Sequence, residues 1–91
     1  MLANPNVAES FADQGNGNAL YNLGLMYARG EGVPQDLVQA HRWTNLAATV
    51  FPAAKAEYRV LAIRLRDALA SLMTPAQLAE AQKLAREWKP G

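Results

Sequence analysis

The sequence predicts an all-α fold, and three observations carry this prediction. Alanine, the strongest helix former, makes up roughly a fifth of the chain, while valine and isoleucine, which favour strands, are scarce. Apolar residues recur at helical spacing in several segments. Short runs that contain glycine or proline separate these segments and are typical of turns. We therefore expect a series of short helices.

Size and composition limit the classes of function. We expect a single domain over residues 1–91, with 51% apolar and 19% charged residues, as is typical of globular domains. A net charge of +1 provides no general attraction to nucleic acid or to a membrane surface, and we expect neither as a partner. The absence of cysteine excludes disulfides and thiolate metal sites. No apolar run is long enough to span a membrane.

The location of the protein stays open. Residues 1–7 lack the basic and apolar regions of a signal peptide. The start does not resemble a natural beginning either, so the protein is expected in the cytoplasm or, if a signal was removed, in the periplasm or outside the cell.

The first half of the chain predicts three helices. A weak candidate over residues 7–13 ends at the breaker run 14–17. A second helix runs from Asn18 to Arg29 and stops at a loop with two glycines and a proline.

The third helix should begin at Asp36, whose carboxylate can cap it, with Gln39 placed for a capping box. It should end near Val50, because Pro52 disfavours helical geometry at Phe51.

The second half predicts two more helices. One long helix should run from Ala53 to Met73. The last has the clearest start signal, with Thr74 as N-cap, Pro75 in the first helical position and Gln77 completing a capping box.

The apolar pattern predicts which faces are buried. The helix from Asn18 is apolar on two sides, which indicates neighbours on both, and Gly24 inside it predicts a close approach of another backbone. In the third helix, His41, Arg42 and Asn45 should lie on the outer face. In the fourth, one wide arc should face the core: Tyr58, Leu61, Ala62, Leu65, Ala68, Leu69 and Leu72.

Two apolar residues, Val60 and Ile63, fall outside that arc of the fourth helix. They are a candidate second packing surface and a possible oligomer surface. Arg59, Arg64, Arg66 and Asp67 should also lie outside the arc.

Small residues, turn glycines and aromatics follow a fixed spacing through the second and third helices. These positions are Ala19, Leu23, Gly24, Tyr27, Gly30, Gly32, Val33, Asp36, Ala40, Trp43, Ala47 and Ala48. The pattern resembles the bacterial type of the Sel1-like repeat, a relative of the tetratricopeptide repeat. The resemblance implies an α-α superhelix, a solenoid of helical repeats. It divides the chain into a remnant of a preceding repeat (1–17), a full repeat (18–51), and a divergent repeat with a C-terminal capping helix (52–91).

The resemblance also implies a function. Such proteins are scaffolds or adaptors, so we expect a protein or peptide partner, no enzymatic activity and no cofactor. A regulatory or accessory module of a larger enzyme or of an envelope or signalling protein is the alternative. Because an incomplete array leaves an apolar end open, we also expect a homodimer or association with an upstream part of a longer chain.

The best candidate for a binding site is a stripe along the first helix of the full repeat. Asn18, Asn22, Leu25 and Arg29 recur at helical spacing, and this helix lines the concave face of helical solenoids. Asparagine can bond a peptide backbone and arginine a carboxylate, but an ordinary solvated stripe is the competing interpretation.

Three other features favour ordinary interpretations. The loop Gly30-Glu31-Gly32 lacks the Lys-Ser/Thr ending of a phosphate-binding loop and is a turn. His41, the only histidine, lacks partners for a metal or catalytic site and should lie at the edge of the core or in solvent. The basic group Lys55, Arg59, Arg64 and Arg66 is interleaved with acidic residues and should be a solvated face rather than a nucleic-acid site.

Overall fold

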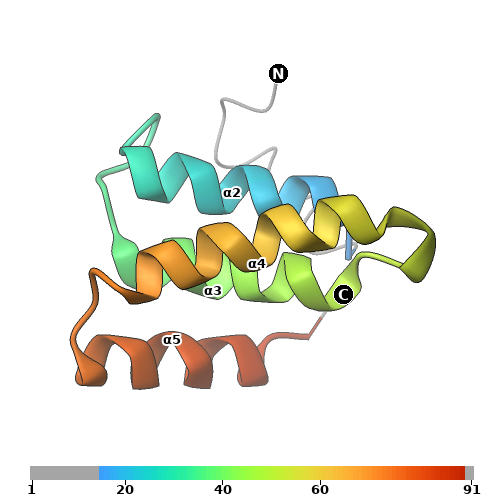
Figure 1. Ribbon diagram of the computed structural model, residues 1–91. Coiled ribbons are helices and arrows are strands. Elements are labelled where there is room, and N and C mark those ends of the chain that lie inside the picture. Colours follow the sequence, from blue (N-terminus) through green and yellow to red (C-terminus); the bar gives the residue numbers. More distant parts are fainter. Residues whose placement is uncertain (1–14, 90–91) are drawn as a thin grey trace.

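A computed structural model describes residues 15–89 of the protein, and within that range every regular element is helical. The α-helices are α2 (Gly17–Arg29), α3 (Leu37–Val50), α4 (Ala56–Ala70) and α5 (Pro75–Glu87), and a short 3-10 helix (Ala53–Lys55) precedes α4 (Figure 1). The all-α prediction is confirmed. The helix predicted over 7–13 and most of the predicted repeat remnant (1–17) lie outside the described residues.

Helix α2 begins one residue earlier than predicted because Asn16 caps it. The Asn16 side chain accepts a hydrogen bond from the Ala19 backbone N–H at 3.1 Å. The helix ends at Gly30, which has a φ of 67° and whose N–H bonds the Met26 carbonyl. This left-handed backbone conformation favours glycine, which explains why the loop forms the predicted turn.

Helix α3 begins as predicted, although with half of the expected capping box. The Asp36 carboxylate accepts from the Gln39 backbone N–H at 3.1 Å. The Gln39 side chain does not return the bond, because its carbonyl oxygen accepts from Arg42 at 3.1 Å while the Asp36 N–H bonds the Tyr27 carbonyl. The helix ends at Val50 and Phe51 is extended, as Pro52 requires.

The last two helices differ in how well their bounds were predicted. The helix expected over 53–73 is shorter than predicted at both ends, since only Ala56–Ala70 is α-helical. Helix α5 follows the prediction at its start. Thr74 and Gln77 bond each other reciprocally, at 3.1 Å from the Gln77 N–H to the Thr74 hydroxyl and 2.9 Å from the Thr74 N–H to the Gln77 side chain.

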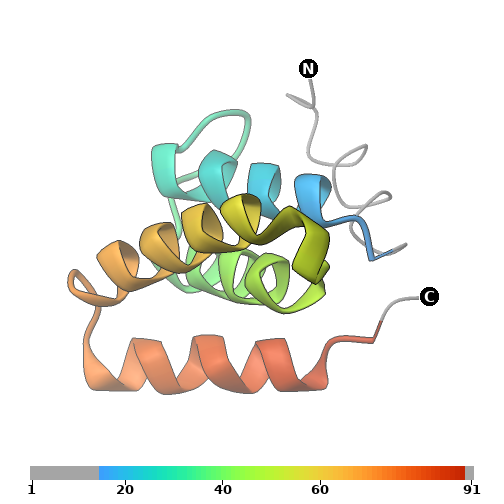
Figure 2. The same ribbon diagram turned by 45° about the vertical axis from the view of Figure 1, so that its right-hand side comes forward.

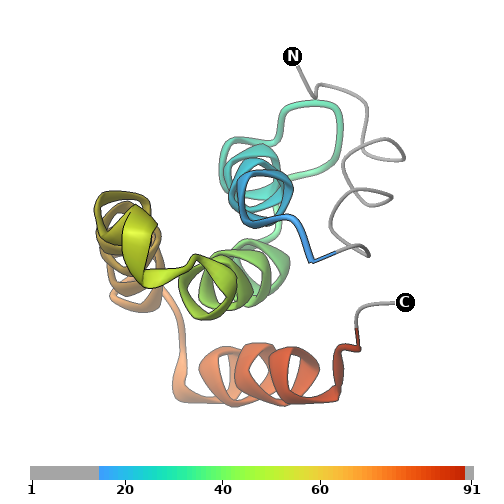
Figure 3. The ribbon, with the colours of Figure 1, turned by 90° about the vertical axis from the view of Figure 1, so that its right-hand side faces the viewer.

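Helix α3 lies at the centre of the described fold. Helices α2, α4 and α5 each pack against it, whereas α4 makes few contacts at most with α2 or α5. Turned by 45°, α5 lies beneath the other helices (Figure 2), and along the helix axes α2, α4 and α5 surround α3 (Figure 3). Helices α2 and α4 run in one direction, and α3 and α5 in the other (Figure 1).

The α2–α3 pair holds most of the core. Its buried side chains include Leu20, Leu23, Trp43, Leu46 and Phe51, with alanines between them. The predicted close approach at Gly24 is confirmed. A Cβ built there would lie within 3.0 Å of the Thr44 methyl carbon and 3.3 Å from the Ala40 carbonyl oxygen, so only glycine fits.

The predicted core face of α4 is wrong for most of its residues. Ala62 and Leu69 are buried, but Tyr58, Leu61 and Leu72 are exposed. The helix instead turns Arg59 and Arg66, which were expected outside the core arc, towards α3.

Hydrogen bonding explains this rotation of α4. Arg59 donates to the Phe51 carbonyl at the C-terminal end of α3, where a cation is favourable, and Arg66 donates to the Asn45 side chain at 3.2 Å. The small Ala62 between them lets the two helices approach closely.

The outer face predicted for α3 is also wrong in part. His41, predicted at the core edge or in solvent, is only 4% exposed, and Arg42 and Asn45 are half-buried. The reason is that α4 and α5 both pack against α3, which therefore has little free surface.

Candidate functional site

Large apolar side chains that remain exposed gather on α4 and just beyond its end. Among the described residues they are Tyr58, Val60, Leu61 and Leu72, of which Leu72 is 71% exposed. Scattered exposed apolar residues are ordinary, whereas several on one helix are a candidate for an interaction surface. This cluster is therefore the first candidate site in the described part of the chain.

Tyr58 is held in place by its neighbours. Its ring stacks on that of Phe51 with the centroids 5.7 Å apart and the planes inclined by 27°. The Lys55 amine lies 5.8 Å from the centroid of the same ring. Because Phe51 is buried, the Tyr58 ring has a rigid support while its own surface stays accessible.

A small hollow lies between the beginnings of α2 and α4. Its lining residues are Asn18, Tyr21, Phe51, Tyr58 and Leu61. Helices α2 and α4 run in the same direction (Figure 1), and the hollow lies between their first turns.

The stripe predicted on α2 borders this hollow at one end. Asn18 is exposed and lines the hollow, while Asn22 and Leu25 are half-buried. Arg29 is exposed at the far end of the helix and lies 3.7 Å from the Glu31 carboxylate. Such an exposed ion pair is weak, so Arg29 can exchange Glu31 for another carboxylate.

The structure separates the two residues of the predicted oligomer surface. Val60 is 44% exposed, whereas Ile63 is partly buried and packs against the core. Val60 therefore belongs with the exposed apolar residues of α4, and a substitution at Ile63 would perturb the core as well.

Sequence reasoning assigned Tyr58 and Leu61 to the core, where apolar periodicity alone places them. The signal that could have found them is the pair Arg59 and Arg66, seven residues apart and hence on one helix face. Both bond to α3, so the part of the apolar arc farthest from these arginines, at Leu61, is turned towards solvent.

The basic group formed by Lys55 and the three arginines of α4 is not one solvated face. Arg59 and Arg66 are half-buried and bond to α3, while Lys55 and Arg64 are exposed. The group is thus divided between the side of α4 that faces α3 and the side that faces solvent.

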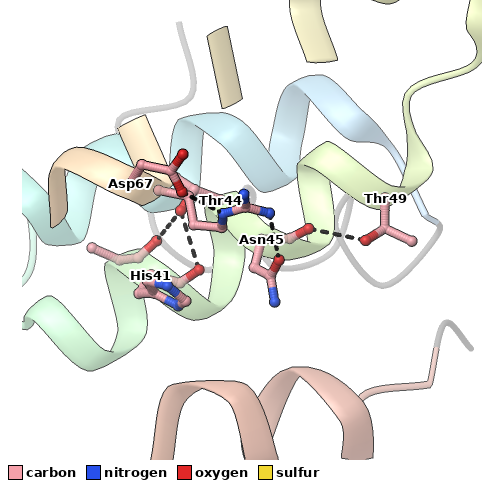
Figure 4. A network of polar contacts seen from close by, with 7 residues as sticks. His41, Thr44, Asn45, Thr49 and Asp67 are labelled. Carbon is pink, nitrogen blue, oxygen red and sulfur yellow. Dashed lines mark hydrogen bonds and ion pairs between the residues drawn. The ribbon is translucent and has the colours of Figure 1, made fainter. Parts of the chain in front are cut away.

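His41 lies where α3, α4 and α5 meet (Figure 4). Its Nδ1 is buried without a hydrogen-bond partner among the described residues. Burial lowers the pKa of His41, the Arg66 charge lowers it further, and Asp67 opposes both. Its surroundings therefore favour the neutral form of His41.

Between residues 15 and 89, no group of His, Asp and Glu side chains is arranged to hold a metal ion. None of the described helices is long and apolar enough to cross a membrane.

Comparison with known proteins identifies the region around α2 and α3. Residues 17–49 match the family model described as the Sel1 repeat, and this range comprises α2, the glycine turn and nearly all of α3. No curated protein and no solved structure matches the chain.

Proposed function

We propose that this chain, whose residues 17–49 match the Sel1 repeat, binds a partner protein through the surface between α2 and α4. Sel1 repeats are in general non-catalytic modules of protein–protein interaction, and a fold alone does not determine the partner. We define the α2–α4 surface as Asn18, Asn22, Leu25 and Arg29 of α2 with Tyr58, Leu61 and Leu72 of the α4 region.

The observation that carries this proposal is the exposure of the apolar side of α4. Tyr58 and Leu61 are 43% and 47% exposed although they lie beside the core. Covering such side chains stabilises a complex by about 25 cal/mol for each Å² of apolar surface removed from water. The support of Tyr58 by Phe51 also reduces the entropy lost when a partner orders that ring.

The spacing on α4 indicates the shape of the partner. Tyr58, Leu61, Leu65, Ala68 and Leu72 alternate in steps of three and four residues, which is the spacing of a helix–helix seam. We therefore propose an amphipathic helix as the bound element, with its apolar side on α4. The asparagines and Arg29 of α2 would then contact polar groups along the edge of that helix.

Affinity capture of partners with matched variants tests the proposal. We expect Leu61→Ser combined with Leu72→Ser to reduce the recovery of specific partners at least about tenfold, which corresponds to about 1.4 kcal/mol. Asn22→Ala combined with Arg29→Ala should give a smaller loss. Lys83→Gln on the exposed side of α5 is the control and should leave recovery unchanged.

All variants should first be shown to keep the wild-type helical content by circular dichroism. If every partner that wild type recovers is also recovered by both surface variants, the α2–α4 surface is not the binding site.

A further inference from the structure

A second surface lies on another side of α3, in a groove between α3 and α5. One hollow, of about 270 Å³, is lined by His41, Asn45, Arg66, Asp67, Ala70, Leu78 and Gln82. The other hollow, of about 310 Å³, is lined by Asn45, Leu46, Thr49, Gln82, Ala85 and Arg86. Asn45 and Gln82 border both hollows, so the two adjoin each other, and together we call them the α3–α5 groove.

The middle of the groove offers two side-chain amides. The Asn45 carbonyl oxygen accepts from Arg66 at 3.2 Å, which leaves both hydrogens of its amide nitrogen to donate elsewhere. Figure 4 shows this nitrogen pointing towards α5. Gln82 faces Asn45 from α5 and is exposed. Two amides that face each other can bond the N–H and C=O groups of an extended backbone.

One end of the groove is lined by a residue with a buried polar atom that lacks a hydrogen-bond partner among the described residues. His41 is 4% exposed and lines the groove, and its Nδ1 has no partner among the described residues. A buried polar atom without a partner costs about 1–3 kcal/mol, so a bound group that supplies a hydrogen bond there would recover this free energy.

The charges of the groove favour an anionic ligand. Asp67 is the one acidic residue in its lining and lies 3.1 Å from Arg66, which it neutralises. Arg86, at the opposite end, forms no ion pair with the described residues. The uncompensated charge of the groove is therefore the Arg86 guanidinium, which can bind a carboxylate through two parallel hydrogen bonds.

From this arrangement we propose that the α3–α5 groove binds an extended peptide segment of a partner protein that carries a carboxylate. The peptide backbone lies between Asn45 and Gln82, its carboxylate contacts Arg86, and a polar group near its other end bonds His41. The site is separate from the α2–α4 surface, because different sides of α3 carry the two. It does not depend on the function proposed above.

Selection from an octapeptide library tests this site with a defined probe. The library is prepared in two forms, with a free carboxylate or an amide at the C-terminus, and selected peptides are resynthesised and titrated. We expect recovered peptides to contain Asp or Glu, or to require the free C-terminus; the two forms distinguish these sources of the carboxylate.

Variants then locate the bound peptide. Arg86→Gln should weaken binding at least about tenfold through loss of a charge-assisted contact, and Asn45→Ala combined with Gln82→Ala should weaken it similarly. Arg64→Gln, which removes an exposed arginine outside the groove, is the matched control and should bind as wild type does. Leu61→Ser should also bind normally, which separates this site from the α2–α4 surface.

The single histidine gives a second, independent measurement. The C–H resonances of His41 report the protonation of its ring. Arg66 and Asp67 of α4 influence the pKa of this ring, whereas Leu78 and Gln82, which line the groove from α5, carry no charge. A polar group of the peptide that bonds the ring should shift these resonances on saturation, and at a peptide concentration near the wild-type Kd, Arg86→Gln should reduce the shift several-fold.

Three results would overturn the proposal. These are a selection that recovers no peptide above background, peptides without any carboxylate requirement, and binding that Arg86→Gln and the double amide variant leave intact.

Discussion

The contact between Gly24 and α3 allows a sharp test of how the repeat is packed. In Gly24→Ala, the added methyl group gains about 1 kcal/mol of helix propensity. It also lies within 3.0 Å of the Thr44 methyl carbon and 3.3 Å from the Ala40 carbonyl oxygen. Overpacking typically costs about 1–3 kcal/mol, and the upper part of this range applies because one neighbour is backbone. We expect a net loss of about 1–2 kcal/mol.

Thermal unfolding followed by circular dichroism measures this loss. For a domain of this size, it corresponds to a decrease in Tm of roughly 5–15 °C. Asn22→Ala on the same helix is the control, because alanine there gains propensity without entering a packed contact. Its Tm should stay the same or rise slightly.

Removing the opposing methyl group should relieve the clash. Thr44→Ser deletes that methyl and keeps the hydroxyl, which donates to the Ala40 carbonyl at 2.9 Å or to the His41 carbonyl at 3.1 Å. In a double-mutant cycle, Gly24→Ala and Thr44→Ser should couple favourably by at least about 1 kcal/mol. A rise in Tm for Gly24→Ala alone, or strict additivity of the pair, would refute the close approach.

Three further predictions concern α4 and its surroundings. Leu69→Ala should lower the free energy of unfolding by about 2–4 kcal/mol and Leu61→Ala by less than about 1, since only Leu69 is buried; equal losses in urea unfolding would contradict the rotation of α4. The pKa of His41 lies below its ordinary 6.5, so as pH falls from 6.5 through that lowered value the unfolded state binds more protons and stability is lost. His41→Gln should flatten this pH dependence of the urea midpoint, and an unchanged slope would place its origin elsewhere. If the chain dimerises through the exposed apolar side of α4, sedimentation should show a dimer that Val60→Asp dissociates; a wild-type monomer at high micromolar concentration would exclude the dimer.

Local signals explain why much of the fold could be predicted. Thr74, Pro75 and Gln77 determine the start of α5 by bonds within one helical turn, and Gly24 marks a close contact because an interior glycine is otherwise unfavourable. In both cases the physical cause lies in a few neighbouring residues, so the sequence is enough to infer it.

The face of α4 could not be predicted in the same way. Helical periodicity places the buried Ala62 and Leu69 on the same arc as the exposed Tyr58 and Leu61, so it cannot show which part of the arc faces the core. That depends on where the Phe51 carbonyl and the Asn45 side chain of α3 lie, and these acceptors become known only with the packing of the helices. The α3–α5 groove was missed for the same reason, since it exists only between packed helices.

The central position of α3 has a consequence for how the protein opens. Helix α4 rests mainly on this one neighbour, so it can detach without separating α2 from α3 or α3 from α5. The backbone amides of α4 should then exchange with solvent deuterium earlier than those of α3. A partner bound to the exposed side of α4 would oppose this detachment. Its binding should therefore slow amide hydrogen exchange along the whole of α4, although the partner contacts only one side of that helix.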